Sequence, residues 1–163
     1  MKTKRSWKEK LNDAKDLPKV QPIPDRMIPK WGNGTMVLPA PLEVDQLMRS
    51  VPRGRVTTIN EILSALALKH HATLSCPMVT GIFAWIAANA SEELVATRPN
   101  ARSTPYWRTL KNGGMLNDKY PGGIKKQKEK LQLEGHRVVK KGKNLAVANL
   151  EDRLFTFKMS DKL

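Results

Sequence analysis

The sequence predicts a mainly α-helical fold, in which a winged-helix-like helix-turn-helix domain at residues 41–163 follows a basic, proline-rich extension at residues 1–40. Two stretches with the apolar spacing of helices, near 58–69 and 75–90, are joined by a short turn. Two short β-prone runs within 137–147 flank a basic tip, which predicts a small C-terminal β-hairpin able to serve as a wing.

Length and charge limit the classes of function. The chain has 163 residues, which is room for one domain, and a net charge of +14. Residues 1–40 carry nine Lys/Arg against four Asp/Glu, and residues 101–163 carry fifteen against six, whereas the middle is neutral. Such asymmetry indicates a polyanionic partner, since neutralised phosphates release counterions. No apolar run approaches the ~18 residues of a membrane span, and the N-terminus lacks an apolar core, so a cytoplasmic, nucleoid-associated protein is expected.

The extension contains four prolines that interrupt regular structure, Pro18, Pro22, Pro24 and Pro29. Lys8 to Lys15 is compatible with one or two helical turns, and one or both of Trp7 and Trp31 are expected to dock on the main body. A solvated tail and a basic arm that touches nucleic acid both remain open for this segment.

The main body is predicted to begin with a helix from Pro41 to Val51, because its apolar residues follow helical spacing and its first turn is acidic. A second helix follows from Thr58, where Thr58 and Glu61 have the spacing of a capping box, and runs to about Lys69.

The next helix is predicted to start at Ser75-Cys76-Pro77, with proline in the first turn. Its inward stripe is predicted to consist of Val79, Ile82, Phe83 and Ile86. The opposite, outward face then consists of small residues: Thr80, Gly81, Ala84, Ala87 and Ala88. Small residues permit close approach to a nucleic-acid backbone, and they equally permit close helix–helix packing.

The C-terminal third is predicted to contain a helix from about Ile124 to Leu133, followed by the hairpin. Basic residues cluster on and just before this helix, at positions 119, 125, 126, 128 and 130. Cys76 is the single cysteine, which excludes an internal disulfide and a thiolate zinc cluster. No metal and no cofactor is predicted.

Four blocks of the sequence, spread over roughly Leu42 to Leu154, form a familiar series. They are Val51-Pro52-Arg53-Gly54-Arg55-Val56-Thr57-Thr58, Pro105-Tyr106-Trp107-Arg108, Tyr120-Pro121-Gly122-Gly123 and Glu134-Gly135-His136-Arg137. In order and spacing, the chain resembles the DNA-binding and alkyl-acceptor domain of the alkylguanine-DNA alkyltransferases (methylated-DNA–protein cysteine methyltransferases). It is most similar to the alkyltransferase-like proteins, which lack the acceptor cysteine.

The resemblance implies minor-groove binding by the second helix of the helix-turn-helix and a pocket for an alkylated guanine. Tyr106 stands at the position of the acceptor cysteine and Trp107 at that of the activating histidine, while Glu134 matches the family glutamate. A phenol with a pKa near ~10 does not replace a thiolate at neutral pH, so no methyltransferase activity is expected. The family arginine that intercalates falls at Thr80 and the family tyrosine at Ile59, which leaves base flipping in question.

The leading hypothesis is therefore a non-enzymatic protein that recognises alkylated or distorted duplex DNA in DNA repair, with a repair-pathway protein as a partner implied by resemblance. The predicted pocket comprises Tyr106, Trp107, Arg108 and Glu134. The predicted DNA contacts are Thr58, Thr80, Gly81, Ala84, Lys125, Lys126 and Lys128.

Two other functions stay open at this point. One is a general basic nucleic-acid-binding protein in which Tyr106 and Trp107 fill a vestigial pocket as core residues. The other is alkyl transfer to Cys76, against which stands the interpretation of Cys76 as a buried, inert thiol. An extruded base is expected to stack on Trp85, Trp107 or Tyr106 if flipping is retained.

Overall fold

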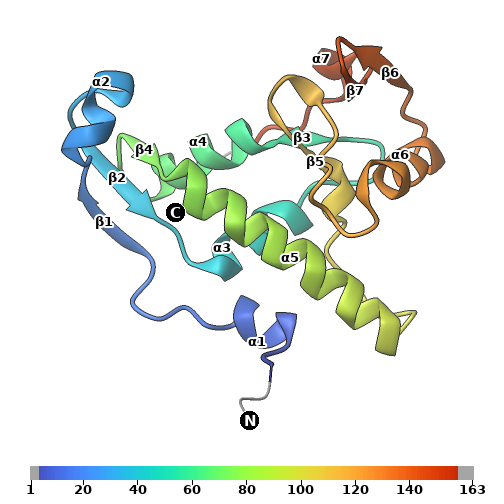
Figure 1. Ribbon diagram of the computed structural model, residues 1–163, viewed down its shortest axis with the longest axis horizontal. Coiled ribbons are helices and arrows are strands. Elements are labelled where there is room, and N and C mark those ends of the chain that lie inside the picture. The colour runs from blue at the N-terminus through green and yellow to red at the C-terminus, as the bar shows by residue number, and fades with distance from the viewer. Residues whose placement is uncertain (1–3, 158–163) are drawn as a thin grey trace.

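A long helix, α5 (Pro77–Thr97), forms the axis around which the other elements pack in the computed structural model, which describes residues 4–157 (Figure 1). Pro77 occupies its first turn, where the missing N–H of proline has no helical partner to lose. The helices α1 (Trp7–Leu11) and α3 (Pro41–Arg49) both contact α5. Val44 and Met48 of α3 share the main core cluster with alanines of α5.

The N-terminal segment folds into the body. Strands β1 (Lys19–Pro22) and β2 (Thr35–Leu38) pair antiparallel, and β2 pairs parallel with β4 (Leu74–Ser75), which lies just before α5. Between β1 and β2 the chain forms a 3₁₀ turn at Asp25–Met27 and the short helix α2 (Ile28–Trp31). Because β1 and β2 share a sheet with β4, the segment is held by non-local pairing that its proline pattern did not predict.

Helix α4 (Ile59–Lys69) begins where the sequence predicted it. Thr58 ends the short strand β3 (Thr57–Thr58) and caps the helix, since its hydroxyl oxygen accepts a hydrogen bond from the Glu61 amide at 3.4 Å. Strand β3 pairs parallel with β5 (Thr109–Leu110). The β3–β5 pair therefore places the start of α4 beside the segment that follows Tyr106.

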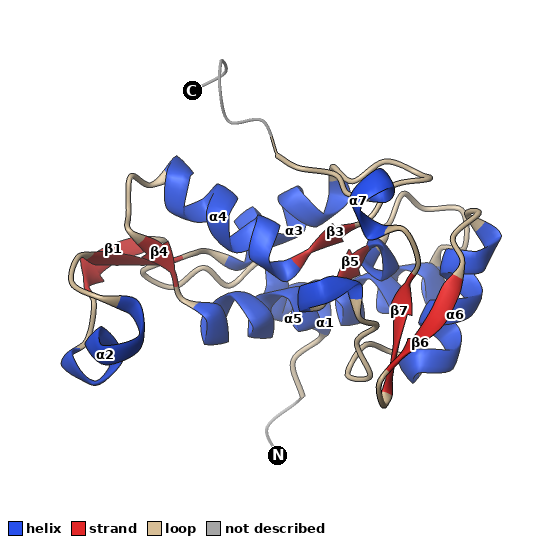
Figure 2. Cartoon of the chain, turned by 90° about the horizontal axis from the view of Figure 1, so that it is seen from above, coloured by secondary structure: helices blue, strands red, loops and turns tan. Residues whose placement is uncertain are grey.

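The C-terminal part consists of α6 (Gly123–Leu133), the antiparallel pair β6 (Val138–Lys141) and β7 (Asn144–Val147), and α7 (Leu150–Arg153). Both views place this hairpin at one end of the molecule and the β1–β2–β4 sheet at the other (Figures 1 and 2). A second core cluster, which includes Leu110, Leu131 and Val147, holds α6 and the hairpin on the body.

The mainly helical composition and the C-terminal hairpin are thus as predicted. Gln127 and Leu131 are the buried residues of α6, and Ile124 also packs against the second cluster, which agrees with the predicted inward positions of Ile124 and Leu131. Between residues 4 and 157, no helix combines the length and the apolar character needed to span a membrane.

Candidate nucleic-acid interface

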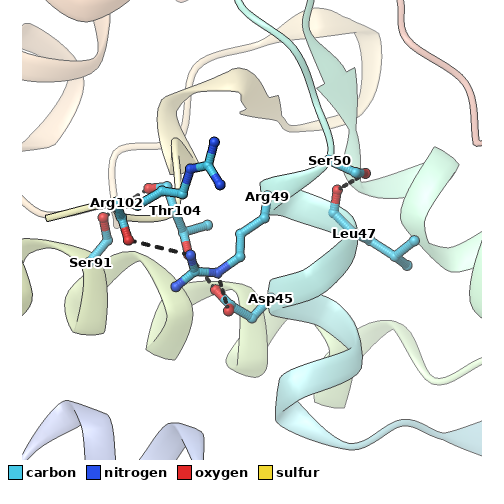
Figure 3. A network of polar contacts seen from close by, with 7 residues as sticks. All are labelled: Asp45, Leu47, Arg49, Ser50, Ser91, Arg102 and Thr104. Atoms are coloured by element: carbon cyan, nitrogen blue, oxygen red, sulfur yellow. Dashed lines mark hydrogen bonds and ion pairs between the residues drawn. The ribbon is translucent and has the colours of Figure 1, made fainter.

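Asp45 anchors the loop that leads to Tyr106 (Figure 3). Its carboxylate, 3% exposed, accepts hydrogen bonds from Arg49 Nε at 2.8 Å and from Thr104 Oγ1 at 2.5 Å. The Thr104 carbonyl in turn accepts a hydrogen bond from Ser91 Oγ of α5 at 2.8 Å. The loop before the aromatic residues is therefore tied to α3 and α5 by buried polar contacts.

Tyr106 is a core residue with only 1% of its surface exposed. Its ring packs edge-on against Trp107 and Tyr120, with centroids 5.4 and 5.3 Å away. Its hydroxyl donates to Glu92 of α5, and the same carboxylate pairs with Lys126 of α6 at 2.7 Å. Burial, and next the hydrogen bond to Glu92, raise the pKa of Tyr106 far above its usual value. A phenol in this setting stays protonated.

Trp107 is covered by basic and polar side chains. Lys130 Nζ lies 4.7 Å from the centre of its ring, and the Arg108 guanidinium lies 5.7 Å from it. Gln127 Nε2 donates to the Trp107 carbonyl at 3.1 Å. Helix α6 therefore holds Trp107 in place.

Arg108 and Glu134 form a paired interaction, in which Nε donates to Oε1 at 2.9 Å and Nη2 donates to Oε2 at 2.7 Å. Arg108 Nη1 also donates to the Val51 carbonyl at 2.8 Å. Burial alone would raise the pKa of Glu134, but the hydrogen bonds and charge of Arg108 outweigh burial and lower it. The pair joins the end of the aromatic segment to the turn after α6.

The structure brings together the four residues predicted to line a pocket, Tyr106, Trp107, Arg108 and Glu134. The Tyr106 hydroxyl bonds to Glu92 and the Arg108 guanidinium to Glu134, whereas the buried Nε1 of Trp107 has no hydrogen-bond partner within the described residues. The burial of Tyr106 agrees with the alternative in which Tyr106 and Trp107 are core residues, whereas Trp107 is only partly buried. Open surface lies elsewhere, along α5.

The predicted orientation of α5 is wrong in part. Of the predicted inward stripe, Val79, Phe83 and Ile86 do pack, partly buried, against the core clusters. Thr80 is fully buried and its hydroxyl is 3.1 Å from Ser75 Oγ, while Ala84 is 3% exposed. Ile82, which was placed inward, is 46% exposed. The small face packs inward because alanine and threonine let α3 approach α5 closely, which was the alternative considered for these residues.

Two predicted DNA contacts, Thr80 and Ala84, therefore lie in the interior, and only Gly81 of the three on α5 is exposed. Thr58 is also misassigned, because it is 6% exposed and its hydroxyl caps α4. A capping threonine and a surface contact have the same sequence signal, and burial separates them.

A groove with a cavity volume of about 730 Å³ follows the exposed side of α5. Met78, Ile82 and Trp85 of α5 contribute its large exposed apolar side chains, at 66%, 46% and 40% exposure. The segment after β5 contributes Lys111 and Lys119. The remaining lining residues are Ile59, Pro77, Gly81, Ala84, Leu110, Asn117 and Tyr120. We call this feature the α5 groove.

The sequence contained one signal for the α5 groove. Met78, Ile82 and Trp85 recur at helical spacing, which places them on one face. A stripe of large apolar residues is normally buried. Only the small residues on the other side of the helix could have indicated that this stripe is exposed. Asn117 and Tyr120 come from a distant loop, and nothing local relates them to α5.

The predicted phosphate-binding lysines of α6 differ in exposure and in ion pairing, and so in whether they can bind a phosphate. Lys125 is exposed and Lys128 is partly exposed, whereas Lys126 Nζ is paired with Glu92. The hairpin tip adds the exposed residues Lys140, Lys141 and Lys143, of which Lys141 donates to the Gly113 carbonyl at 3.2 Å. Lys125 and Lys128 remain candidates for phosphate contact.

Cys76 is 6% exposed and lies in a cluster with Ile23 and Met36. The part of the chain from residue 4 to 157 contains no group of three or more His, Cys, Asp or Glu side chains arranged to hold a metal ion.

No protein-family model matches the sequence, and no curated protein matches it. Two solved structures are similar: Atl1 of S. pombe in complex with damaged DNA containing O6-carboxymethylguanine, and the S. pombe ATL protein in complex with DNA. Each is 19% identical, with a TM-score of 0.49, over 71% of this chain and 94% of the other. An identity and a TM-score at this level do not assign the chain to a family.

Proposed function

We propose that this chain is a non-enzymatic DNA-binding protein that recognises alkylated or distorted duplex DNA with the α5 groove. The observation that carries the proposal is the composition of this groove, in which three exposed apolar side chains lie beside two lysines in a chain of net charge +14.

The groove suits a nucleic acid in both size and chemistry. About 730 Å³ lies within the usual range of ~300–1,000 Å³ for ligand pockets. Exposed apolar side chains that gather on one surface mark interaction sites more often than scattered ones do. Base faces and deoxyribose are apolar and the phosphates beside them are anionic, so Met78, Ile82 and Trp85 complement the former and Lys111 and Lys119 the latter.

Phosphate contact beyond the groove comes from Lys125 and Lys128 of α6 and from the basic tip of the hairpin. Contacts of this kind fix the position of the protein on DNA but carry no sequence information. The proposed binding is therefore weakly dependent on sequence and strongly dependent on salt.

We further propose that α4 and α5 act as a helix-turn-helix with the β6–β7 hairpin as its wing, and that α5 faces the minor groove. The four sequence blocks shared with the alkyltransferases support this docking and support alkylated guanine as the lesion. The same resemblance supports a repair-pathway protein as a further partner.

The burial of the two residues that would have to perform alkyl transfer supports a non-enzymatic role. Tyr106 is buried, hydrogen-bonded to Glu92 and held protonated. Cys76 is buried in a cluster that includes Ile23 and Met36. Transfer through Cys76 would add the mass of the alkyl group to the protein after incubation with alkylated DNA, and we expect an unchanged mass.

Two variants that each introduce one carboxylate test the use of the groove. Ile82→Glu places a carboxylate in the α5 groove, and Leu68→Glu places one at a 59% exposed site on α4 outside the groove lining. Both variants change net charge equally, so only groove contact separates them. We expect Ile82→Glu to weaken duplex binding at least tenfold more than Leu68→Glu. Equal loss in the two variants would reject the groove as the binding surface.

A general basic nucleic-acid-binding role is the second candidate. Two observations favour it. Position 80 carries a buried threonine where the resemblance would place an arginine wedge, and Tyr106 is buried as a core residue. This role predicts equal affinity for alkylated and unmodified duplexes, whereas the first predicts a preference.

A further inference from the structure

We infer that Trp85 is the surface on which an unpaired base of the bound DNA stacks, and that Trp7 of the N-terminal segment holds this ring in place. The inference rests on the proposed function. It adds to the interface a segment that does not itself line the groove.

Trp85 is placed to receive a base. It lies in the middle of α5, is 40% exposed and lines the α5 groove together with Gly81 and Lys119. A glycine beside it leaves open space, since a Cβ at Gly81 would meet no atom within 4 Å. A flat ligand can therefore approach the indole without meeting another side chain at this position.

Trp7 of α1 packs against the indole ring of Trp85. The two rings make a T-shaped contact with centroids 4.8 Å apart and planes at 85°. Trp7 is fixed in turn, because the Glu93 carboxylate of α5 accepts hydrogen bonds from the backbone amides of Trp7 and Lys8, each at 3.1 Å. Lys10 Nζ lies 4.2 Å from the centre of the Trp7 ring. Helix α1 therefore acts as a brace for Trp85.

Three other aromatic side chains are candidates for stacking with a base, and each is either covered or lies outside the α5 groove. Tyr106 is buried and Trp107 is covered by Lys130. Trp31 has the same 40% exposure as Trp85, but it lines a smaller cavity of about 310 Å³ whose lining includes no charged side chain. Trp85 alone of these four combines exposure with the lysines of the α5 groove.

The expected ligand is an unpaired base within a duplex, with flanking phosphates near Lys111 and Lys119. Every base has a π-face, so stacking tolerates any base and gives preference for an unpaired site without sequence readout. A base that is already unpaired has no base pair to break, so its extrusion costs less than that of a paired base, which favours damaged over intact duplex.

The test compares affinities for two duplexes of one sequence, one fully paired and one with an abasic site opposite a single base. Wild type is expected to prefer the second duplex. Trp85→Ala and Trp85→Leu are expected to lose this preference, because affinity for the abasic duplex falls by about 5- to 150-fold, further than affinity for the paired duplex. Leucine retains apolar bulk, so its failure isolates stacking from hydrophobic contact.

Trp7 and Trp31 complete the design. Trp7→Ala is expected to lower affinity for the abasic duplex by about two- to tenfold, Trp7→Phe to restore it, and Trp31→Ala to leave the preference intact. Circular dichroism and urea unfolding check that each variant is folded.

The outcomes separate this inference from the function on which it rests. Wild type that binds neither duplex would reject the proposed function and this inference together. Wild type that binds both duplexes equally, or a preference unaltered in Trp85→Leu, would overturn the stacking role of Trp85 and leave DNA binding standing.

Discussion

Arg108 and Glu134 face each other across the join between the aromatic segment and the turn after α6, and both oxygens of the carboxylate accept hydrogen bonds from the guanidinium, at 2.9 and 2.7 Å. The side chains are only 13% and 4% exposed. The pair therefore fixes the position of α6 relative to the core rather than serving as free surface for a ligand.

Removal of one partner of the Arg108–Glu134 pair is expected to destabilise the fold. Arg108→Ala leaves the Glu134 carboxylate buried without its main donor, which is expected to lower the free energy of unfolding by about 3–5 kcal/mol. Urea unfolding followed by circular dichroism measures the loss. Arg53→Ala is the matched control, because Arg53 is 69% exposed and 3.8 Å from the same carboxylate, and is expected to cost at most about 1 kcal/mol. Equal losses would contradict the assigned role of Arg108.

Tyr106→Phe tests whether Tyr106 acts as a core residue. The change keeps the ring in its packed site and removes the hydrogen bond to Glu92, so a loss of about 1–2 kcal/mol in the free energy of unfolding is expected. Affinity for alkylated DNA is expected to change less than twofold, because the hydroxyl does not line the α5 groove. A large loss of affinity in a stably folded variant would return Tyr106 to a live pocket.

His136 predicts a pH dependence of stability. It is 4% exposed, and its two ring nitrogens have no hydrogen-bond partner within the described residues. Burial, and then the positive charges of Arg153 and Arg108, lower its pKa, with Glu134 acting in the opposite direction. A lowered pKa in the folded state means that the unfolded chain binds the proton more readily. Stability is therefore expected to fall as pH drops from about 7 through the unfolded value near 6.5.

The variant His136→Leu, which removes the titrating group, is expected to flatten that part of the profile. His71→Gln serves as the control, because His71 is exposed, and it is expected to leave the profile unchanged. Urea unfolding from pH 7.5 to 5 measures both variants. A wild-type profile without any slope in this interval would contradict the burial of a neutral His136.

Removal of a lysine that binds phosphate is expected to weaken the salt dependence of DNA binding and to leave the preference for a lesion unchanged. Lys125→Ala and Lys128→Ala should each lower the slope of log affinity against log salt by about 1. The ratio between alkylated and unmodified duplexes should not change. Lys69→Ala is the control, because its ammonium pairs with Glu43 on α3 at 2.6 Å. A slope lowered equally in all three variants would indicate a diffuse charge effect.

The local parts of the fold followed from the sequence. The Thr58 cap, Pro77 in the first turn of α5 and the strands on either side of the basic tip are set by residues a few positions apart, and each is present. The β1–β2–β4 sheet was not predicted, because β4 joins it from about forty residues further along the chain and prolines dominate the local signal.

The orientation of α5 could not be read from its residue types. Both faces carry apolar residues, and the stripe of Val79, Ile82, Phe83 and Ile86 was taken as the buried one, of which only Ile82 is exposed. The structure buries the alanines against α3 and leaves Met78, Ile82 and Trp85 outside. Which face is covered depends on how closely the neighbouring helices approach, and this is a property of the tertiary packing.

The most direct test of the central claim is equilibrium binding of wild type to one duplex with and without a single alkylated guanine, at about 50 and 200 mM salt. Recognition through the α5 groove predicts tighter binding of the alkylated duplex at both salt concentrations, with the preference lost in Ile82→Glu. Equal and strongly salt-dependent binding to the two duplexes would contradict damage recognition and leave phosphate contact as the whole of the interaction.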